Sequence, residues 1–148
     1  MKRQLLLLSI FLITLSSSAF NKDSLWTVWN DTTQADTNRF WAIHEIIWSD
    51  PSLDTAIYLC ELQYGLAKKT GDKKLIAKAL YIQGLIFYYY KGNSEQALKD
   101  LYHCLNINEE LRNKNNIANC FNAIGNIYKE QSDFEQALIY QKKNLEIR

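Results

Sequence analysis

The first residues that could do chemistry are His44 and Glu45, in the segment "HEIIW". A zinc-protease helix carries two histidines four positions apart on one face, with a glutamate between them as general base. Here Trp48 stands where the second histidine would be, so this face lacks a ligand. We therefore expect no zinc site at this segment.

A second candidate is His103 beside Cys104, which resembles a base next to a nucleophile. Neighbouring residues on a helix point about 100° apart, so these two side chains cannot face each other. The sequence shows no glycine-rich phosphate loop, G-x-S-x-G motif or carboxylate pair. We expect no catalytic site, no metal site and no cofactor.

The three cysteines, Cys60, Cys104 and Cys120, contain no C-x-x-C pair. This pattern indicates neither a zinc framework nor a disulfide scaffold. In an exported protein one pair could oxidise, which would leave one free thiol.

Composition favours one folded domain. The chain has 148 residues, of which 47% are hydrophobic and 22% charged, with one proline and five glycines. The net charge is +1, and no block of like charges occurs. The sequence therefore lacks the basic field with which proteins gather nucleic-acid phosphates, and we expect no nucleic-acid partner.

The N-terminus has the pattern of a signal peptide. Lys2 and Arg3 precede the apolar run "LLLLSIFLITL", and the small residues "SSSA" follow it. We expect a signal peptide over residues 1–19, cut after Ala19 or one residue earlier after Ser18, and export to the periplasm or another extracytoplasmic compartment. The alternative is an uncleaved anchor, although the run is shorter than the roughly 20 residues that cross a bilayer.

Residues 20–36 carry polar and turn-forming residues, and we expect an extended lead-in segment there. From Thr37 onward apolar residues recur at i, i+3, i+4 and i+7, which predicts amphipathic helices over 37–148. Residues typical of helix boundaries divide this region: Pro51, Gly71, Asp72, Gly92, and the capping pairs Asn93 with Gln96 and Asp133 with Gln136.

An internal repeat organises these helices. Gly84 and Gly125 are 41 positions apart, Ala97 and Ala137 are 40 apart, and Ala56 lies 41 before Ala97. Three helix pairs are therefore expected, at about 37–71, 72–113 and 114–148. A glycine inside a helix costs about 0.5–1 kcal/mol relative to alanine. Its recurrence before an alanine predicts close packing between the two helices of a pair.

These positions resemble the tetratricopeptide repeat, whose helix pair has a small residue at its eighth position, an aromatic at its eleventh and an alanine at its twentieth. The matching sets are Gly125, Tyr128 and Ala137 in the last pair, and Gly84, Phe87 and Ala97 in the middle pair. In the first pair Ala56 fits, but His44 replaces the small residue. The resemblance implies an all-α, right-handed superhelix of three helix-turn-helix pairs, with the last helix truncated at Arg148.

The period of about 40 residues exceeds the family's usual 34. Longer repeats of this kind are similar to those of exported bacterial proteins, including sensor regions that precede a membrane helix and a histidine-kinase or nucleotide-cyclase domain. This resemblance leaves two interpretations open. One is a stand-alone interaction module, and the other is the sensory part of a longer signalling protein.

In this family the first helix of each pair lines a concave groove that binds protein or peptide partners. The corresponding positions here are Trp41, Glu45 and Trp48; Lys78, Tyr81, Leu85 and Tyr88; and Asn119, Asn122, Asn126 and Lys129. Asparagine amides can both donate to and accept from a peptide backbone. The alternative is a solvated face. Asn122 stands where a family lysine holds a terminal carboxylate, which argues against carboxylate capture.

Two further expectations follow from the helical pattern and the resemblance. Cys104 and Cys120 fall at positions that pack between helices, where small core residues are the default and a disulfide is the alternative. In "FYYYK", we expect Phe87 to be buried, Tyr88 to line the groove, and Tyr89 or Tyr90 to be partly exposed.

Overall fold

The computed structural model describes residues 22–49 and 53–147. The predicted signal peptide and the break at Pro51 lie outside these residues. Within them the chain is all-α, as predicted, and no strand occurs. The helices are α2 (Lys22–Asn30), α3 (Asp36–Ser49), α4 (Leu53–Thr70), α5 (Lys73–Lys91), α6 (Ser94–Glu110), α7 (Lys114–Glu130) and α8 (Phe134–Ile147).

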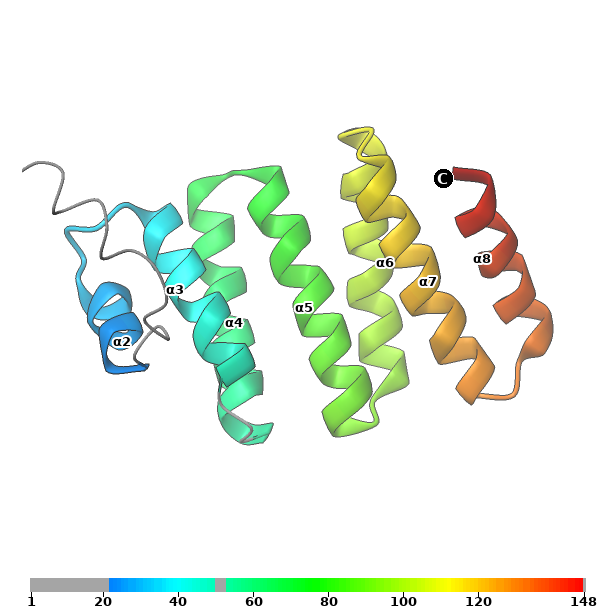
Figure 1. The fold of residues 1–148 in the computed structure, drawn as a ribbon, viewed down its shortest axis with the longest axis horizontal. Coiled ribbons are helices and arrows are strands. Elements are labelled where there is room, and N and C mark those ends of the chain that lie inside the picture. The colour runs from blue at the N-terminus through cyan, green and yellow to red at the C-terminus, as the bar shows by residue number, and fades with distance from the viewer. Residues whose placement is uncertain (1–21, 50–52, 148) are drawn as a thin grey trace, which may run out of the picture.

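The helices form a row in which each packs against the next in sequence (Figure 1). In this view α3, α5 and α7 lie toward the viewer, and α4 and α6 lie behind them. Helix α5 also contacts α7 directly. The first helices of successive pairs therefore share one face of the molecule, as a groove built from these helices requires.

The segment before Thr37 is not the extended lead-in that we predicted, because Lys22–Asn30 forms helix α2. Leu25 is buried, and Val28 and Trp29 are half-buried in the same apolar cluster as residues of α3. These three positions have the i, i+3, i+4 spacing of one helical face. Contact with α3 thus stabilises a helix of only 9 residues, which would be marginal alone.

The predicted N-caps are confirmed where α6 and α8 begin. Oδ1 of Asn93 accepts a hydrogen bond from the backbone N–H of Gln96 at 3.0 Å, and Asp133 does the same for Gln136 at 3.1 Å. The side chain of Gln96 does not complete a reciprocal capping box. It donates instead to Asp100, at 2.9 Å.

Both repeat glycines lie against the partner helix of their pair. A Cβ atom on Gly84 would come within 2.9 Å of Cγ of Leu101 and 3.2 Å of the Ala97 carbonyl oxygen. On Gly125 it would come within 3.0 Å of the Gln141 side-chain nitrogen and 3.5 Å of the Ala137 carbonyl oxygen. The predicted close packing is confirmed. A Cβ at Gly84 would lie closer to the backbone of the partner helix than a Cβ at Gly125 would.

None of the helices in the described ranges is long and apolar enough to cross a membrane.

Candidate peptide-binding groove

The predicted asparagine stripe lies on the accessible face of α7. Asn119, Asn122 and Lys129 are exposed, and Asn126 is half-buried. On the opposite side of the same helix, Ile117, Cys120, Ile124 and Ile127 are buried in the core. From Asn119 to Lys129 the stripe extends about 15 Å at 1.5 Å per helical residue. That length accommodates about four or five residues of an extended peptide.

The facing side comes from α5, where the predicted residues are more deeply placed. Lys78, Tyr81 and Leu85 are half-buried, whereas Tyr88 is only 7% exposed. Burial, together with a hydrogen bond to Glu130, raises the pKa of the Tyr88 hydroxyl. Tyr88 is therefore the most deeply buried of the groove residues predicted on α5.

A small, partly open pocket, which we call the inner pocket, lies between α5, α6 and α7. Its volume is about 50 Å³, and its lining residues are Ala77, Lys78, Tyr81, Cys104, Asn108, Asn116 and Asn119. Among the lining residues, Ala77 of α5 and Cys104 and Asn108 of α6 are buried. Three predicted groove residues, Lys78, Tyr81 and Asn119, meet here.

A more open depression, the outer hollow, lies at the other end of the stripe. Its volume is about 280 Å³, and its lining residues are Tyr88, Tyr89, Asn126, Lys129 and Glu130. Three more predicted groove residues, Tyr88, Asn126 and Lys129, meet in it. Asn122 lies on the same stripe of α7, between the inner pocket and the outer hollow. The residues predicted on α5 and α7 thus follow one continuous face.

The residues predicted on α3 occupy a different place. Trp41 and Glu45 line an apolar hollow of about 520 Å³ between α2 and α3, together with Leu25 and Val28 of α2. This hollow exists because the lead-in folds as a helix against α3. We therefore assign the candidate groove to α5 and α7, and treat the α3 residues separately.

The motif "HEIIW" forms an aromatic row. The ring of His44 meets Trp41 edge-on with centroids 5.3 Å apart, and Trp48 with centroids 6.5 Å apart. Burial, followed by the positive charge of Lys78, lowers the pKa of His44. No group of histidines, cysteines and carboxylates in the described residues could hold a metal ion.

The "FYYYK" segment is exposed at Tyr89 and Tyr90, as predicted, with 64% and 50% of each residue accessible. Phe87 is half-buried rather than fully buried. The ammonium of Lys91 lies 5.7 Å from the centre of its ring. Tyr88 and Tyr89 of this segment both line the outer hollow, and their ring centroids lie 4.6 Å apart.

The structure brings Cys104 and Cys120 together as thiols. Their sulfur atoms lie 3.4 Å apart, both side chains are buried, and Cys120 donates to Cys104. That hydrogen bond and burial raise the pKa of Cys120. His103, next in sequence to Cys104, is exposed. The helix therefore separates the histidine from the thiol, as the angle between neighbouring positions requires.

Asn108, Asn116 and Glu130 line the inner pocket or the outer hollow but were not predicted from the sequence. The family's groove positions lie on the first helix of each pair, whereas Asn108 belongs to the second helix. A signal was available in the sequence. Leu101, Cys104, Leu105 and Asn108 follow the i, i+3, i+4, i+7 spacing, which places a polar asparagine on a face that is otherwise apolar.

Residues 75–148 match the family model of the tetratricopeptide repeat. The chain belongs to the tetratricopeptide repeat family. This match covers the middle and last helix pairs, including every residue of the inner pocket and of the outer hollow.

This chain is similar in sequence to one known protein and in fold to another. Tetratricopeptide repeat protein 29 of Trypanosoma brucei brucei (strain 927/4 GUTat10.1) is 31% identical over 102 residues, which cover 64% of this chain and 21% of that protein. The crystal structure of BtubC (BKLC) from P. vanneervenii superposes with a TM-score of 0.71 at 18% identity, over 86% of this chain and 52% of that one. The chain thus spans about a fifth and about half of these two proteins, and the second likeness concerns the fold alone.

Tetratricopeptide repeats generally bind protein partners and serve as non-catalytic scaffolds. Membership of the family therefore assigns this chain to protein–protein interaction modules at the level of function class.

Proposed function

We propose that this protein binds an extended peptide segment of a partner along the face shared by α5 and α7. The observation that carries the proposal is the stripe of amide side chains on α7, which is bounded by the inner pocket and the outer hollow. Amides that are exposed yet fixed on a helix can pair with both the N–H and the C=O groups of a peptide backbone.

The rigidity of the scaffold supports this mechanism. The side of α7 opposite the stripe packs into a core shared by α5, α6 and α7, so the amides are held at a fixed spacing. A preformed surface avoids the entropy cost of ordering a loop at binding. The groove therefore presents its side chains in a fixed arrangement and binds without a large conformational change.

We further propose that the protein works after export, on the strength of the signal-peptide pattern in residues 1–19. The sensory region of a longer signalling protein is the alternative, and it rests on the family resemblance. Both interpretations use the same groove. N-terminal sequencing of protein recovered from outside the cytoplasm tests export, with Phe20 as the expected first residue and an intact Met1 as the contrary result.

The binding proposal is tested by selection from a random peptide library displayed on phage, with the purified protein as bait. We expect enriched peptides that bind saturably in solution. Their amide-proton resonances and those of residues 116–130 should shift together on mixing. Enriched peptides that perturb only α4 or α8, or the lack of any enrichment, would remove the groove assignment.

A further inference from the structure

The face of α3 that points away from the core carries a row of three aromatic rings. His44 lies at its centre and meets Trp41 and Trp48 edge-on, with ring centroids 5.3 and 6.5 Å away. The two tryptophans are 47% and 50% exposed, whereas Phe40 and Ile43 of the same helix are fully buried. Aromatic side chains that are exposed on a rigid element are typical of contact surfaces. We call Trp41, His44 and Trp48 the aromatic row.

The spacing of the two tryptophans favours one conformation of a peptide that contacts both. They lie on one helix, seven positions apart, so their Cα atoms are separated by about 10.5 Å along its axis. A polyproline II helix rises about 3.1 Å per residue and repeats every three residues, so equivalent residues lie about 9.3 Å apart. A β-strand presents side chains to one side at intervals of about 6.8 Å, which gives about 6.8 or 13.6 Å. The polyproline II spacing is therefore the closer match.

An α-helical partner would also match this distance, with two side chains seven positions apart. The apolar turn between those side chains would then lie against Glu45, which is exposed and charged. A polyproline II segment avoids this conflict, because the residues between two prolines of the same face point to the sides.

The apolar hollow between α2 and α3 lies beside the aromatic row and adds charge complementarity. Its volume is about 520 Å³, and its lining residues are Leu25, Val28, Asn38, Trp41, Ala42 and Glu45. Glu45 is the ionisable member of this lining, and it forms no salt bridge within residues 22–49 and 53–147. An arginine side chain suits such a hollow. Its hydrocarbon stem can contact the apolar residues while its guanidinium pairs with the carboxylate and donates to the neutral amide of Asn38.

We propose that the aromatic row and the adjoining hollow bind a proline-rich peptide segment that contains arginine. Two prolines three positions apart rest on Trp41 and Trp48, and an arginine between them enters the hollow and pairs with Glu45. Proline fixes the extended conformation before binding, which lowers the entropy cost of association. This surface belongs to α2 and α3, so the inference goes beyond the proposed groove on α5 and α7 and does not depend on it.

The test uses three short peptides with acetylated and amidated ends, each titrated into the ¹⁵N-labelled purified protein at pH 7. Three repeats of Pro-Arg-Pro should shift the indole N–H resonances of Trp41 and Trp48 saturably. Three repeats of Pro-Glu-Pro keep the conformation and reverse the charge, and three repeats of Ala-Arg-Ala keep the charge and remove the prolines. Each control peptide should bind at least tenfold more weakly. The lack of a saturable shift, or equal binding of either control peptide, would overturn the proposal.

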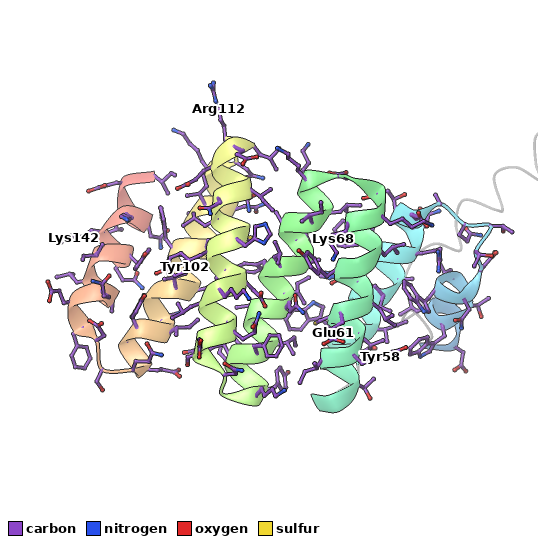
Figure 2. The ribbon with its side chains drawn as sticks, turned by 180° about the vertical axis from the view of Figure 1, so that it is seen from behind. Tyr58, Glu61, Lys68, Tyr102, Arg112 and Lys142 are labelled. Carbon is purple, nitrogen blue, oxygen red and sulfur yellow. The ribbon has the colours of Figure 1, made fainter. Side chains whose placement is uncertain are left out.

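Variants assign the contact to named side chains. Trp48→Ala removes one exposed ring and should weaken binding of the Pro-Arg-Pro peptide at least tenfold. Tyr58→Ala is the matched control and should leave binding unchanged, because Tyr58 is 58% exposed on α4, a different helix (Figure 2). Glu45→Gln should weaken binding at least threefold, with Glu61→Gln on α4 as its control, and it decides if Trp48→Ala fails to fold. Unchanged binding in folded Trp48→Ala or Glu45→Gln would contradict the assignment.

The two proposals fail separately. A Pro-Arg-Pro peptide that shifts only residues 116–130 would remove the site on α3. A response of Trp41 and Trp48, without any selected peptide that shifts residues 116–130, would keep the site on α3 and remove the groove.

Discussion

The sulfur atoms of Cys104 and Cys120 lie 3.4 Å apart, in the contact that joins the second and third helix pairs. One sulfur belongs to α6 and the other to α7, so a bond between them would link two successive repeats. Cys60 lies in a different apolar cluster with α2 and α3.

We predict that refolding in excess glutathione disulfide produces the Cys104–Cys120 disulfide and leaves Cys60 reduced. Two thiols are oxidised, one glutathione disulfide is reduced to two glutathiones, and the protein loses two hydrogens. Closing a loop of this length stabilises a protein by about 3 kcal/mol in the chain-entropy account. Peptide mapping by mass spectrometry identifies which cysteines are joined, and thermal melting measures the gain in stability.

The cysteines of the folded protein should react with glutathione disulfide more slowly than those of the refolding chain. Burial raises the pKa of Cys60 to about 12, and the hydrogen bond to Cys104, followed by burial, raises the pKa of Cys120. The thiolate, which is the reactive form, is therefore scarce at neutral pH. Rapid cross-linking of native protein, or a bridge that includes Cys60, would contradict this description of the core.

The two repeat glycines should respond differently to alanine. In Gly84→Ala the new Cβ meets Leu101 and the Ala97 backbone, and we expect a loss of about 1–2 kcal/mol in the free energy of unfolding. In Gly125→Ala the nearest atom is the mobile end of Gln141, and we expect a change near zero or a gain of up to about 1 kcal/mol from helix propensity.

Gly65→Ala is the control for this comparison, because nothing lies within 4 Å of a Cβ built at this helical position. It should stabilise by about 1 kcal/mol. Urea unfolding of the three variants gives the values. Equal effects at Gly84 and Gly65 would show that the close helix contact does not exist.

The buried carboxyl group of Asp100 should make the stability of the protein depend on pH. The side chain is 6% exposed, one oxygen accepts from Gln96 and the other has no partner, and burial raises the pKa of the carboxyl group. A raised pKa means that the folded state holds the proton longer than the unfolded state does. The stability that the protonated Asp100 carboxyl group contributes is therefore fully present below pH 3.8. It is lost as the pH rises through the pKa that this group has in the folded protein.

Asp100→Asn removes the buried charge while keeping an acceptor for Gln96. We expect the variant to melt at a higher temperature than the wild type at pH 7, and the difference to shrink as the pH falls toward 3.8. Melting curves at several pH values measure this. A difference that grows at low pH would have the wrong sign for a buried carboxylate.

The sequence was sufficient for the parts of the fold that depend on local pattern. Gly84 and Gly125 marked the helix contacts, and Asn93 and Asp133 marked helix starts, because these features arise from residues near one another in sequence. Helix α2 escaped prediction since its stability comes from packing on α3. Leu25, Val28 and Trp29 have helical spacing, but a segment of nine residues is too short for that pattern alone to predict a stable helix.

Packing between helices also limited what could be predicted about the groove. The positions of Asn119, Asn126 and Tyr88 in the repeat pattern predicted residues that line the two hollows, but the pattern carries no information on depth, and Tyr88 is only 7% exposed. The helical pattern marks Asn108 as a polar residue on an apolar face, but its place in the lining of a pocket between three helices could not be predicted from that pattern. Such a feature exists only after the helices have packed.

The face opposite the groove supplies the controls for the central claim. Figure 2 shows the molecule from behind, with Glu61 on α4 and Lys142 on α8 among its labelled side chains. Both are exposed. The double variant Glu61→Ala/Lys142→Ala therefore removes two polar side chains, as a groove double variant does, without touching α5 or α7.

The most direct measurement is the dissociation constant of one selected peptide, determined by isothermal titration calorimetry for the wild type and the two double variants. Asn122→Ala/Asn126→Ala removes two backbone-pairing amides worth about 0.5–1.5 kcal/mol each, so the groove account predicts affinity at least about fivefold weaker. Glu61→Ala/Lys142→Ala should bind as the wild type does. Equal affinity for the wild type and the asparagine variant, or an equal loss in both variants, would contradict the assignment of peptide binding to this face.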